Sequence, residues 1–322
     1  MKNPMKSPIL YLMAGMALLF IACSSDDDKA QEEGMPIRLT ANVAQITTRA
    51  DVDIQNEQFL ANSKVKVYAE ENKENGVAST KYAENGYVFV ASGSGALYPE
   101  TGAYPYYPTS SNTVALTGYA PYSDTKKVTK STTAFSVESD QRTESSYIDS
   151  DLMFSNNITA QGKSSSAVLM TFNHKMTKII VKLKAYNPDN DPTQQENLNA
   201  ILIGSAVSLK NVARSVTFNP TTGAVSNPTS VGNIQMTDNG YYQSAAIIAP
   251  QTIAQQSLFI QITMKTGGDI MDFRLPQEFT FEEGKAYTFT ITVRQDAIVV
   301  GEYTIEDWIE TPVTTTTGTL LN

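Results

Sequence analysis

The chain has 322 residues, a formal net charge of −9, one cysteine and one histidine. An acidic balance without basic clusters argues against nucleic acid as a partner, and a single cysteine excludes a disulfide within the chain. The length allows two domains of ordinary size, each of which must be stabilised by packing alone.

The N-terminus is typical of an export signal. Lys2 and Lys6 precede an uncharged apolar run over residues 9–22. Because this run is too short to span a bilayer, we interpret residues 1–22 as a signal peptide. No second apolar run of spanning length follows, so no transmembrane helix is expected.

The signal ends at the only cysteine. Residues 20–23 read Phe-Ile-Ala-Cys, which resembles the lipobox of bacterial lipoproteins, and this resemblance implies that Cys23 is acylated. The acidic run over residues 24–28 resembles the signal that sends Bacteroidetes lipoproteins to the outer face of the outer membrane. Acyl chains on Cys23 would hold the chain on that membrane. A free thiol within an ordinary signal is the alternative.

The first strand follows a polar tether. Between residues 36 and 46, Ile37, Leu39, Ala41 and Val43 fall on one face and polar residues on the other. This period of two predicts a half-buried strand, which ends before Arg49.

Short strands account for most of the remaining chain. The pattern predicts strands at residues 65–68, 87–90, 114–122, 167–172, 178–184, 200–209, 245–249, 257–264, 269–274, 286–294 and 298–303, and a hairpin at residues 216–225. Residues 98–108, with three prolines and four tyrosines, suit an extended edge segment, and residues 187–197 suit a loop. After the signal no long segment has a helical period. We therefore expect an all-β protein with two tandem β-sandwiches, at residues 50–163 and 164–322.

The sequence offers little for catalysis. A nucleophile–imidazole device would depend on His174, which follows a strand, and zinc would need several His or Cys ligands. Asp189, Asn190 and Asp191 begin like a calcium loop, but the required glycine and closing glutamate are missing, so a solvated turn is favoured. No pair of acids stands out as a glycosidase pair. We expect no enzyme, no metal and no cofactor.

Several motifs together resemble the fimbrillin family, the subunits of Bacteroidetes type V pili. They comprise the signal ending at Cys23, the sequence Thr-Thr-Arg-Ala at residues 47–50, Ser-Asp-Leu-Met at residues 150–153, the segment 168–178 with Phe172 and His174, and the strand 287–293 followed by Ile-Glu-Asp-Trp at residues 305–308. The resemblance implies transthyretin-like sandwiches and a subunit of a surface pilus.

The resemblance also implies how the subunit would assemble. Fimbrillins reach the outer membrane as lipidated precursors, and an Arg-specific protease cuts just after the first strand; here the cut would separate Arg49 from Ala50. Residues 23–49 would then be a tether and removable strand, carrying Ile37, Leu39, Ala41 and Val43. Its groove would be filled by the C-terminal strand of another subunit. The expected donor positions are Ile305, Ile309, Val313 and Leu321.

The expected partners are therefore other pilin subunits, the Arg-specific protease, the outer membrane and a host protein or glycan. A surface glycan-binding lipoprotein is the alternative function. In that case the tyrosines of the proline-rich segment, Tyr98, Tyr104, Tyr106 and Tyr107, would stack on sugars.

Overall fold

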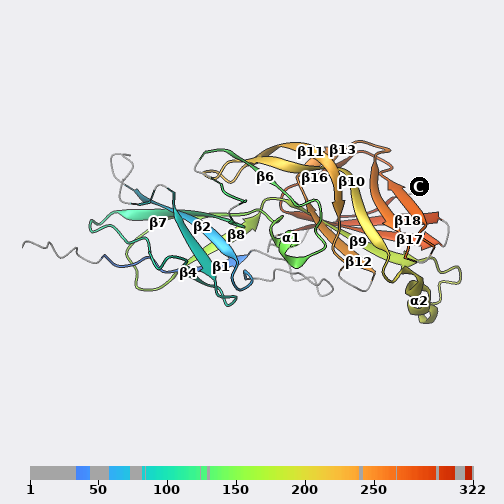
Figure 1. Cartoon of the computed structure of the whole chain (residues 1–322), viewed down its shortest axis with the longest axis horizontal. Coiled ribbons are helices and arrows are strands. Elements are labelled where there is room, and N and C mark those ends of the chain that lie inside the picture. The colour runs from blue at the N-terminus through green and yellow to red at the C-terminus, as the bar shows by residue number, and fades with distance from the viewer. Residues whose placement is uncertain are drawn as a thin grey trace, which may run out of the picture. The chain divides into compact units, whose positions relative to one another are not determined.

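The computed structural model describes residues 34–43, 58–72, 82–83, 85–123, 125–128, 131–238, 242–265, 267–294, 297–308 and 316–320. Within them the chain forms nineteen strands, two short α-helices and one 3₁₀ helix (Figure 1). The all-β prediction is confirmed. None of the helices in these ranges is both long and apolar enough to span a membrane.

A closed sheet forms the N-terminal half of the described chain. Its strands follow the order β1 (Leu39–Val43), β4 (Ala96–Pro99), β3 (Tyr87–Ala91), β2 (Lys64–Asn72), β5 (Thr113–Ala120), β7 (Met153–Gln161) and β8 (Val168–His174). β1 closes the circle because it pairs with β4 on one side and β8 on the other. The expected two-layer sandwich is corrected here to a barrel. Alternation along a strand reveals its buried face, but not which distant strand it pairs with.

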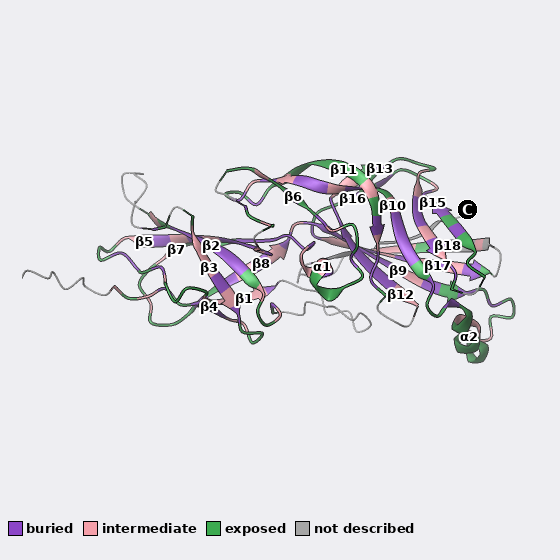
Figure 2. Cartoon of the chain, viewed as in Figure 1, coloured by how far each residue is buried: buried purple, intermediate pink, exposed green. Residues whose placement is uncertain are grey.

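The C-terminal half contains two larger sheets. The first has the order β11 (Val225–Gln235), β10 (Ala206–Phe218), β14 (Leu258–Thr263), β15 (Ile270–Arg274), with β6 (Thr133–Ser136) also paired to β10. The second has the order β12 (Gln243–Ile248), β9 (Thr177–Ala185), β17 (Lys285–Arg294), β18 (Ala297–Asp307), β19 (Thr316–Leu320). β13 (Gln251–Ile253) pairs with β16 (Phe279–Phe281). Both large sheets contribute buried side chains to one core, which appears purple in Figure 2.

The expected boundary between residues 163 and 164 does not coincide with the end of the barrel. β8 lies after that boundary, yet it pairs with β1 and β7 of the barrel. Conversely, β6 lies before the boundary and pairs with β10. The two halves are therefore joined by strands that pair across the expected boundary, as well as by the connecting chain.

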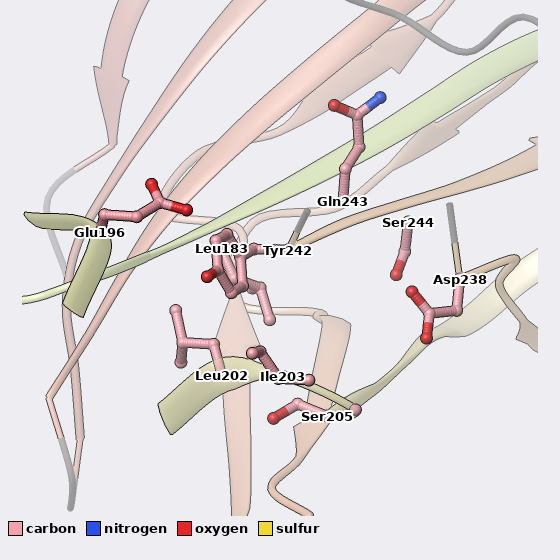
Figure 3. A pocket seen from close by; sticks show the side chains of 10 residues that line it. Leu183, Glu196, Leu202, Ile203, Ser205, Asp238, Tyr242, Gln243 and Ser244 are labelled. Carbon is pink, nitrogen blue, oxygen red and sulfur yellow. The ribbon is translucent and has the colours of Figure 1, made fainter. Parts of the chain in front are cut away.

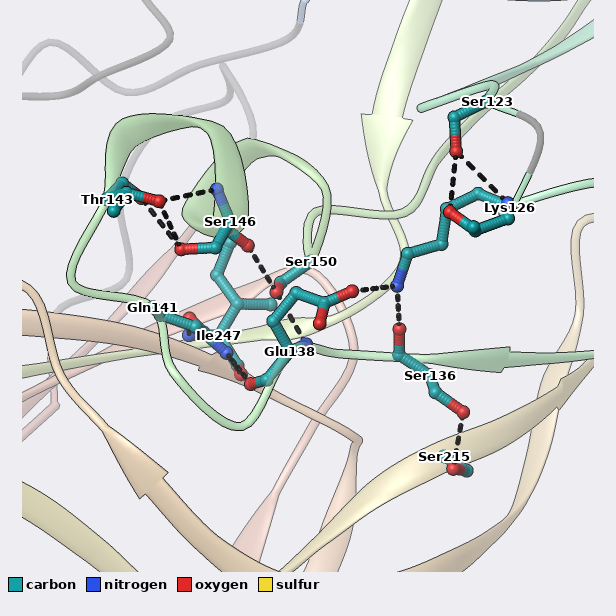
Figure 4. A network of polar contacts seen from close by, with 11 residues as sticks. Ser123, Lys126, Ser136, Glu138, Gln141, Thr143, Ser146, Ser150, Ser215 and Ile247 are labelled. Atoms are coloured by element: carbon teal, nitrogen blue, oxygen red, sulfur yellow. Dashed lines mark hydrogen bonds and ion pairs between the residues drawn. The ribbon is translucent and has the colours of Figure 1, made fainter.

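A polar network attaches the chain between β5 and β7 to the C-terminal sheets (Figure 4). Gln141 is fully buried, and its side chain both donates to the carbonyl of Ile247 and accepts from its N–H, each at 2.8 Å. Ser136 and Ser215 hydroxyls lie 2.7 Å apart, and Ser150 accepts from the Glu138 N–H at 2.9 Å. The two Gln141 bonds satisfy backbone groups of Ile247 in β12 that would otherwise be unpaired.

The helices are short and lie in the connections between strands. α1 (Glu144–Ile148) begins at Thr143, whose hydroxyl accepts from the Ser146 N–H. α2 (Pro192–Asn199) begins at Asp191, whose carboxylate accepts from the Thr193 N–H, and is followed by the 3₁₀ helix Ala200–Leu202. The loop expected at residues 187–197 is therefore wrong. α2 buries no residue, so it has no apolar stripe that would reveal a helix.

Candidate functional site

The candidate site is the gap between β4 and β8 that β1 fills. β1 runs antiparallel to β4, with Leu39 opposite Leu97, and parallel to β8, from Leu39 opposite Val168 to Val43 opposite Phe172. Without β1, the described edges of β4 and β8 would not be joined. The strand thus occupies a groove with a partner on each side.

Alternate side chains of this segment are buried in the barrel core. Ile37, Leu39, Ala41 and Val43 are between 0% and 3% exposed. Covering the three larger side chains contributes about 1.5–3 kcal/mol each, so together they stabilise the occupied groove by about 4.5–9 kcal/mol. An empty groove would expose the same apolar surface to water.

The proline-rich tyrosine segment extends the groove beyond β4. The Ile37 N–H donates to the Pro105 carbonyl at 2.8 Å, and the Tyr107 N–H donates to the Met35 carbonyl at 2.9 Å. Tyr107 is 1% exposed, and Tyr104 packs edge-on against Phe89. Two of the four tyrosines proposed as sugar platforms therefore pack in the core, whereas Tyr98 and Tyr106 are exposed.

The sequence profile described as fimbrillin-like matches residues 48–308. The chain belongs to the fimbrillin-like family. No curated protein matches it.

Two solved Bacteroides structures have a similar fold. A candidate cell adhesion protein from Bacteroides uniformis has 20% identity and a TM-score of 0.63, over 85% of this chain and 98% of the other. A candidate cell adhesion protein from Bacteroides ovatus has 20% identity and a TM-score of 0.60, over 87% of this chain and 99% of the other. At this identity the likeness establishes the fold.

The described part of the expected donor tail lies within the fimbrillin-like chain's own sheet. Ile305 is a half-buried residue of β18, where it pairs with Tyr287 of β17 and Thr316 of β19. Ile305 therefore has a neighbouring strand of its own chain on each side. Outside the described residues lie Ile309, Val313 and Leu321, and also Cys23, Arg49, Ala50 and the signal peptide expected at residues 1–22.

Three buried residues that are distant in the sequence, Asp151, His174 and Trp308, form one cluster, which we call the Asp–His–Trp cluster. His174 Nδ1 donates to Asp151 Oδ1 at 2.8 Å. The His174 ring stacks on the Trp308 ring, with 3.7 Å between the ring centroids and an angle of 5° between the ring planes. All three residues are at most 4% exposed. Each lies in a motif that the sequence analysis singled out, but their convergence depends on the fold.

Two ring nitrogens of this cluster are incompletely satisfied. Among the described atoms, His174 Nε2 and Trp308 Nε1 are buried without a hydrogen-bond partner. Each such group costs about 1–3 kcal/mol relative to a solvated one. The cluster therefore combines close packing with polar atoms that would gain hydrogen bonds in water.

The cavities offer no evident catalytic device. One of about 270 Å³ lies beside α2, with Glu196 and Asp238 at its rim and Leu183, Leu202 and Tyr242 among its lining residues (Figure 3). Both carboxylates are exposed, and the lining contains no imidazole or thiol. A second cavity, of about 340 Å³, is lined partly by Asp149, whose carboxyl pKa is raised by burial. Within the described chain no three His, Cys, Asp or Glu side chains gather as a metal site would require.

Proposed function

We propose that this fimbrillin-like chain is a structural or adhesive subunit of a cell-surface type V pilus, assembled by strand exchange. The observation that carries the proposal is the placement of β1, which fills a groove between β4 and β8 with three buried side chains, Leu39, Ala41 and Val43. Membership of the fimbrillin-like family supports a pilus subunit whose partners are other pilins. Its role is structural and not catalytic.

In the proposed sequence of events, the chain is exported by residues 1–22 and acylated at Cys23 on the outer membrane. An Arg-specific protease then cuts between Arg49 and Ala50. Arg49 follows Val43 by six residues, so the cut separates β1 from the rest of the barrel without breaking a described strand. β1 is then held only by its pairing and its buried side chains.

The donor in this proposal is the chain after Trp308. Because Ile305 is paired within β18, the proposed donor strand begins after it and not at residue 305. The apolar side chains that this donor would bury in the groove are Ile309, Val313 and Leu321. β19 lies at the edge of its sheet and is held by β18 alone among the described strands. Exchange would therefore move an edge strand into a groove that has partners on both sides, which satisfies more backbone groups.

The domain proposal changes accordingly. Residues 23–49 act as the tether and removable strand, residues 50–163 supply most of the barrel, and residues 164–322 supply its last strand β8, a C-terminal sandwich and the donor tail.

Size-exclusion chromatography tests the proposal. The precursor, an Arg49→Ala variant and a chain ending at Trp308 are each treated with an arginine-specific endoprotease, and cleavage is mapped by mass spectrometry. We expect polymers from the first protein and monomers from the other two. Monomers from the correctly cut precursor, or polymers from the chain ending at Trp308, would contradict strand exchange through this tail.

A further inference from the structure

The Asp–His–Trp cluster lies between the groove and the start of the donor tail. His174 is the last residue of β8, and its side chain follows the buried series Val168, Met170 and Phe172 on the same face of the strand. Trp308 comes directly after β18. The stacked rings therefore connect the strand that borders β1 with the strand that holds β19.

β8 is positioned by β1 on one side and by β7 on the other. β1 pairs with β8 from Val168 to Phe172, whereas β7 pairs with it at Asn173 and His174. Before Asn173, β7 and β8 are linked by the side chain of Asn157 in β7, which donates to the Leu169 carbonyl and accepts from the Thr171 N–H. Removing β1 would leave residues 168–172 without a paired strand, and the Asn157 side chain would remain as their hydrogen-bonded link to β7.

Trp308 is likewise held at a few defined points. The main-chain N–H of Trp308 donates to the Gly284 carbonyl at 2.6 Å, and the main-chain N–H of Gly284 donates to the Met176 carbonyl at 2.9 Å. The Lys178 ammonium lies 5.6 Å from the centre of the indole ring. Met176 lies in the turn after β8, and Lys178 is the second residue of β9. Because both follow His174 closely in the chain, a shift of β8 would disturb several of these contacts together.

We propose that the Asp–His–Trp cluster couples the two ends of strand exchange: with β1 in its groove the cluster holds Trp308 and keeps β19 on β18, and loss of β1 releases both. The inference rests on the proposed function. It makes Asp151, His174 and Trp308 positioning residues that keep the donor strand on its own subunit until an acceptor groove is open. The unpaired ring nitrogens favour release, since each gains water when the stack opens.

The chain offers a direct probe, because Trp308 is its only tryptophan and His174 its only histidine. Acrylamide quenching of tryptophan fluorescence is measured on the full precursor, on the monomer fraction after the Arg49 cut and removal of β1, and on that fraction with a synthetic peptide of residues 34–49. We expect quenching to increase severalfold on loss of β1 and to return with the peptide. Equal quenching in all three samples would overturn the proposal.

Hydrogen–deuterium exchange of the uncut full chain tests the residues themselves. In Trp308→Ala the amides of β19 should exchange about tenfold faster, whereas Trp308→Phe, which keeps a stacked ring, should protect them. Ile298→Ala is the matched control, because Ile298 lies in β18 and packs against the C-terminal core but pairs with Val293 and not with β19. Equal acceleration in Ile298→Ala and Trp308→Ala would indicate general weakening of β18 and would contradict the coupling.

The two proposals fail in different ways. If loss of β1 exposes Trp308 but no polymers form, the coupling stands and strand exchange fails. If polymers form while Trp308 stays protected throughout, strand exchange stands and the coupling fails. Circular dichroism of each variant checks that it folds, and the peptide experiment on the unaltered chain needs no variant.

Discussion

Leu39→Ala weakens β1 at its first residue, which pairs with both β4 and β8. Leu39 is 2% exposed and lies between Leu97 of β4 and Val168 of β8. Truncating a buried leucine to alanine costs about 2–5 kcal/mol, because it removes apolar contacts and leaves a cavity. We therefore expect the uncut precursor to lose about that much unfolding free energy.

The same substitution should act strongly after the cut. Once β1 is held by non-covalent contacts alone, a cost of about 2–5 kcal/mol corresponds to dissociation about 30 to 5,000 times faster if it appears wholly in the off-rate. A labelled peptide of residues 34–49, with or without the substitution, can be followed as it leaves the cut protein. If loss of β1 limits assembly, Leu39→Ala should also polymerise sooner.

Thr40→Ala is the matched control for this experiment. Thr40 is the next residue of β1, but it is only half-buried and its hydroxyl lies 3.5 Å from the Val168 carbonyl. A change at such a position stays within about 0.5 kcal/mol. Equal release of the Leu39→Ala and unsubstituted peptides would refute the claim that buried side chains hold β1 in place.

Three further substitutions test other parts of the account. Cys23→Ala should abolish labelling by radioactive palmitate and retention on the membrane, and labelling of this variant would exclude the assigned lipid site. Gln141→Ala leaves the N–H and carbonyl of Ile247 without their partner, so it should lower the free energy of unfolding in urea by about 2–6 kcal/mol. A change below about 0.5 kcal/mol, which is typical of a surface substitution, would show that the network in Figure 4 does not stabilise the fold. Asp149→Asn should raise the urea midpoint at pH 7. Burial raises the carboxyl pKa of Asp149 in the folded state, so the folded protein is destabilised once the pH exceeds that pKa and the carboxyl is charged, whereas asparagine stays neutral. The advantage of Asp149→Asn should vanish at a pH below the ordinary aspartate pKa of about 3.9, and a pH-independent effect would exclude titration as its cause.

The sequence predicted much of this fold because most strands alternate in the ordinary way. The pattern of Ile37, Leu39, Ala41 and Val43 correctly identified a strand and its buried face. It could not identify β4 and β8 as the partners, since these pairs join residues far apart in the chain. Barrel closure and the pairing of β6 with β10 are non-local for the same reason.

The remaining differences have local causes. The stretch expected as one strand over residues 200–209 begins as a 3₁₀ helix and continues into β10, because short apolar runs fit either structure. Ile305 matched the alternation of a donor strand, yet the same alternation suits β18 of the chain's own sheet. The Asp–His–Trp cluster could not be predicted, since Asp151, His174 and Trp308 come from three separate motifs.

An engineered disulfide tests most directly whether the tail of one subunit occupies the β1 groove of another. With Cys23 replaced by serine, Leu169→Cys is combined with one cysteine at each position from 313 to 320 in turn; Leu169 is exposed on β8 opposite Thr40 of β1. Thr40→Cys with Leu169→Cys in the uncut chain is the positive control and should crosslink within one molecule.

The account predicts intermolecular disulfides at alternate tail positions after the Arg49 cut and none before it, read as dimers and higher species on a non-reducing gel. Polymers that form without a crosslink between Leu169→Cys and any tail position would contradict it.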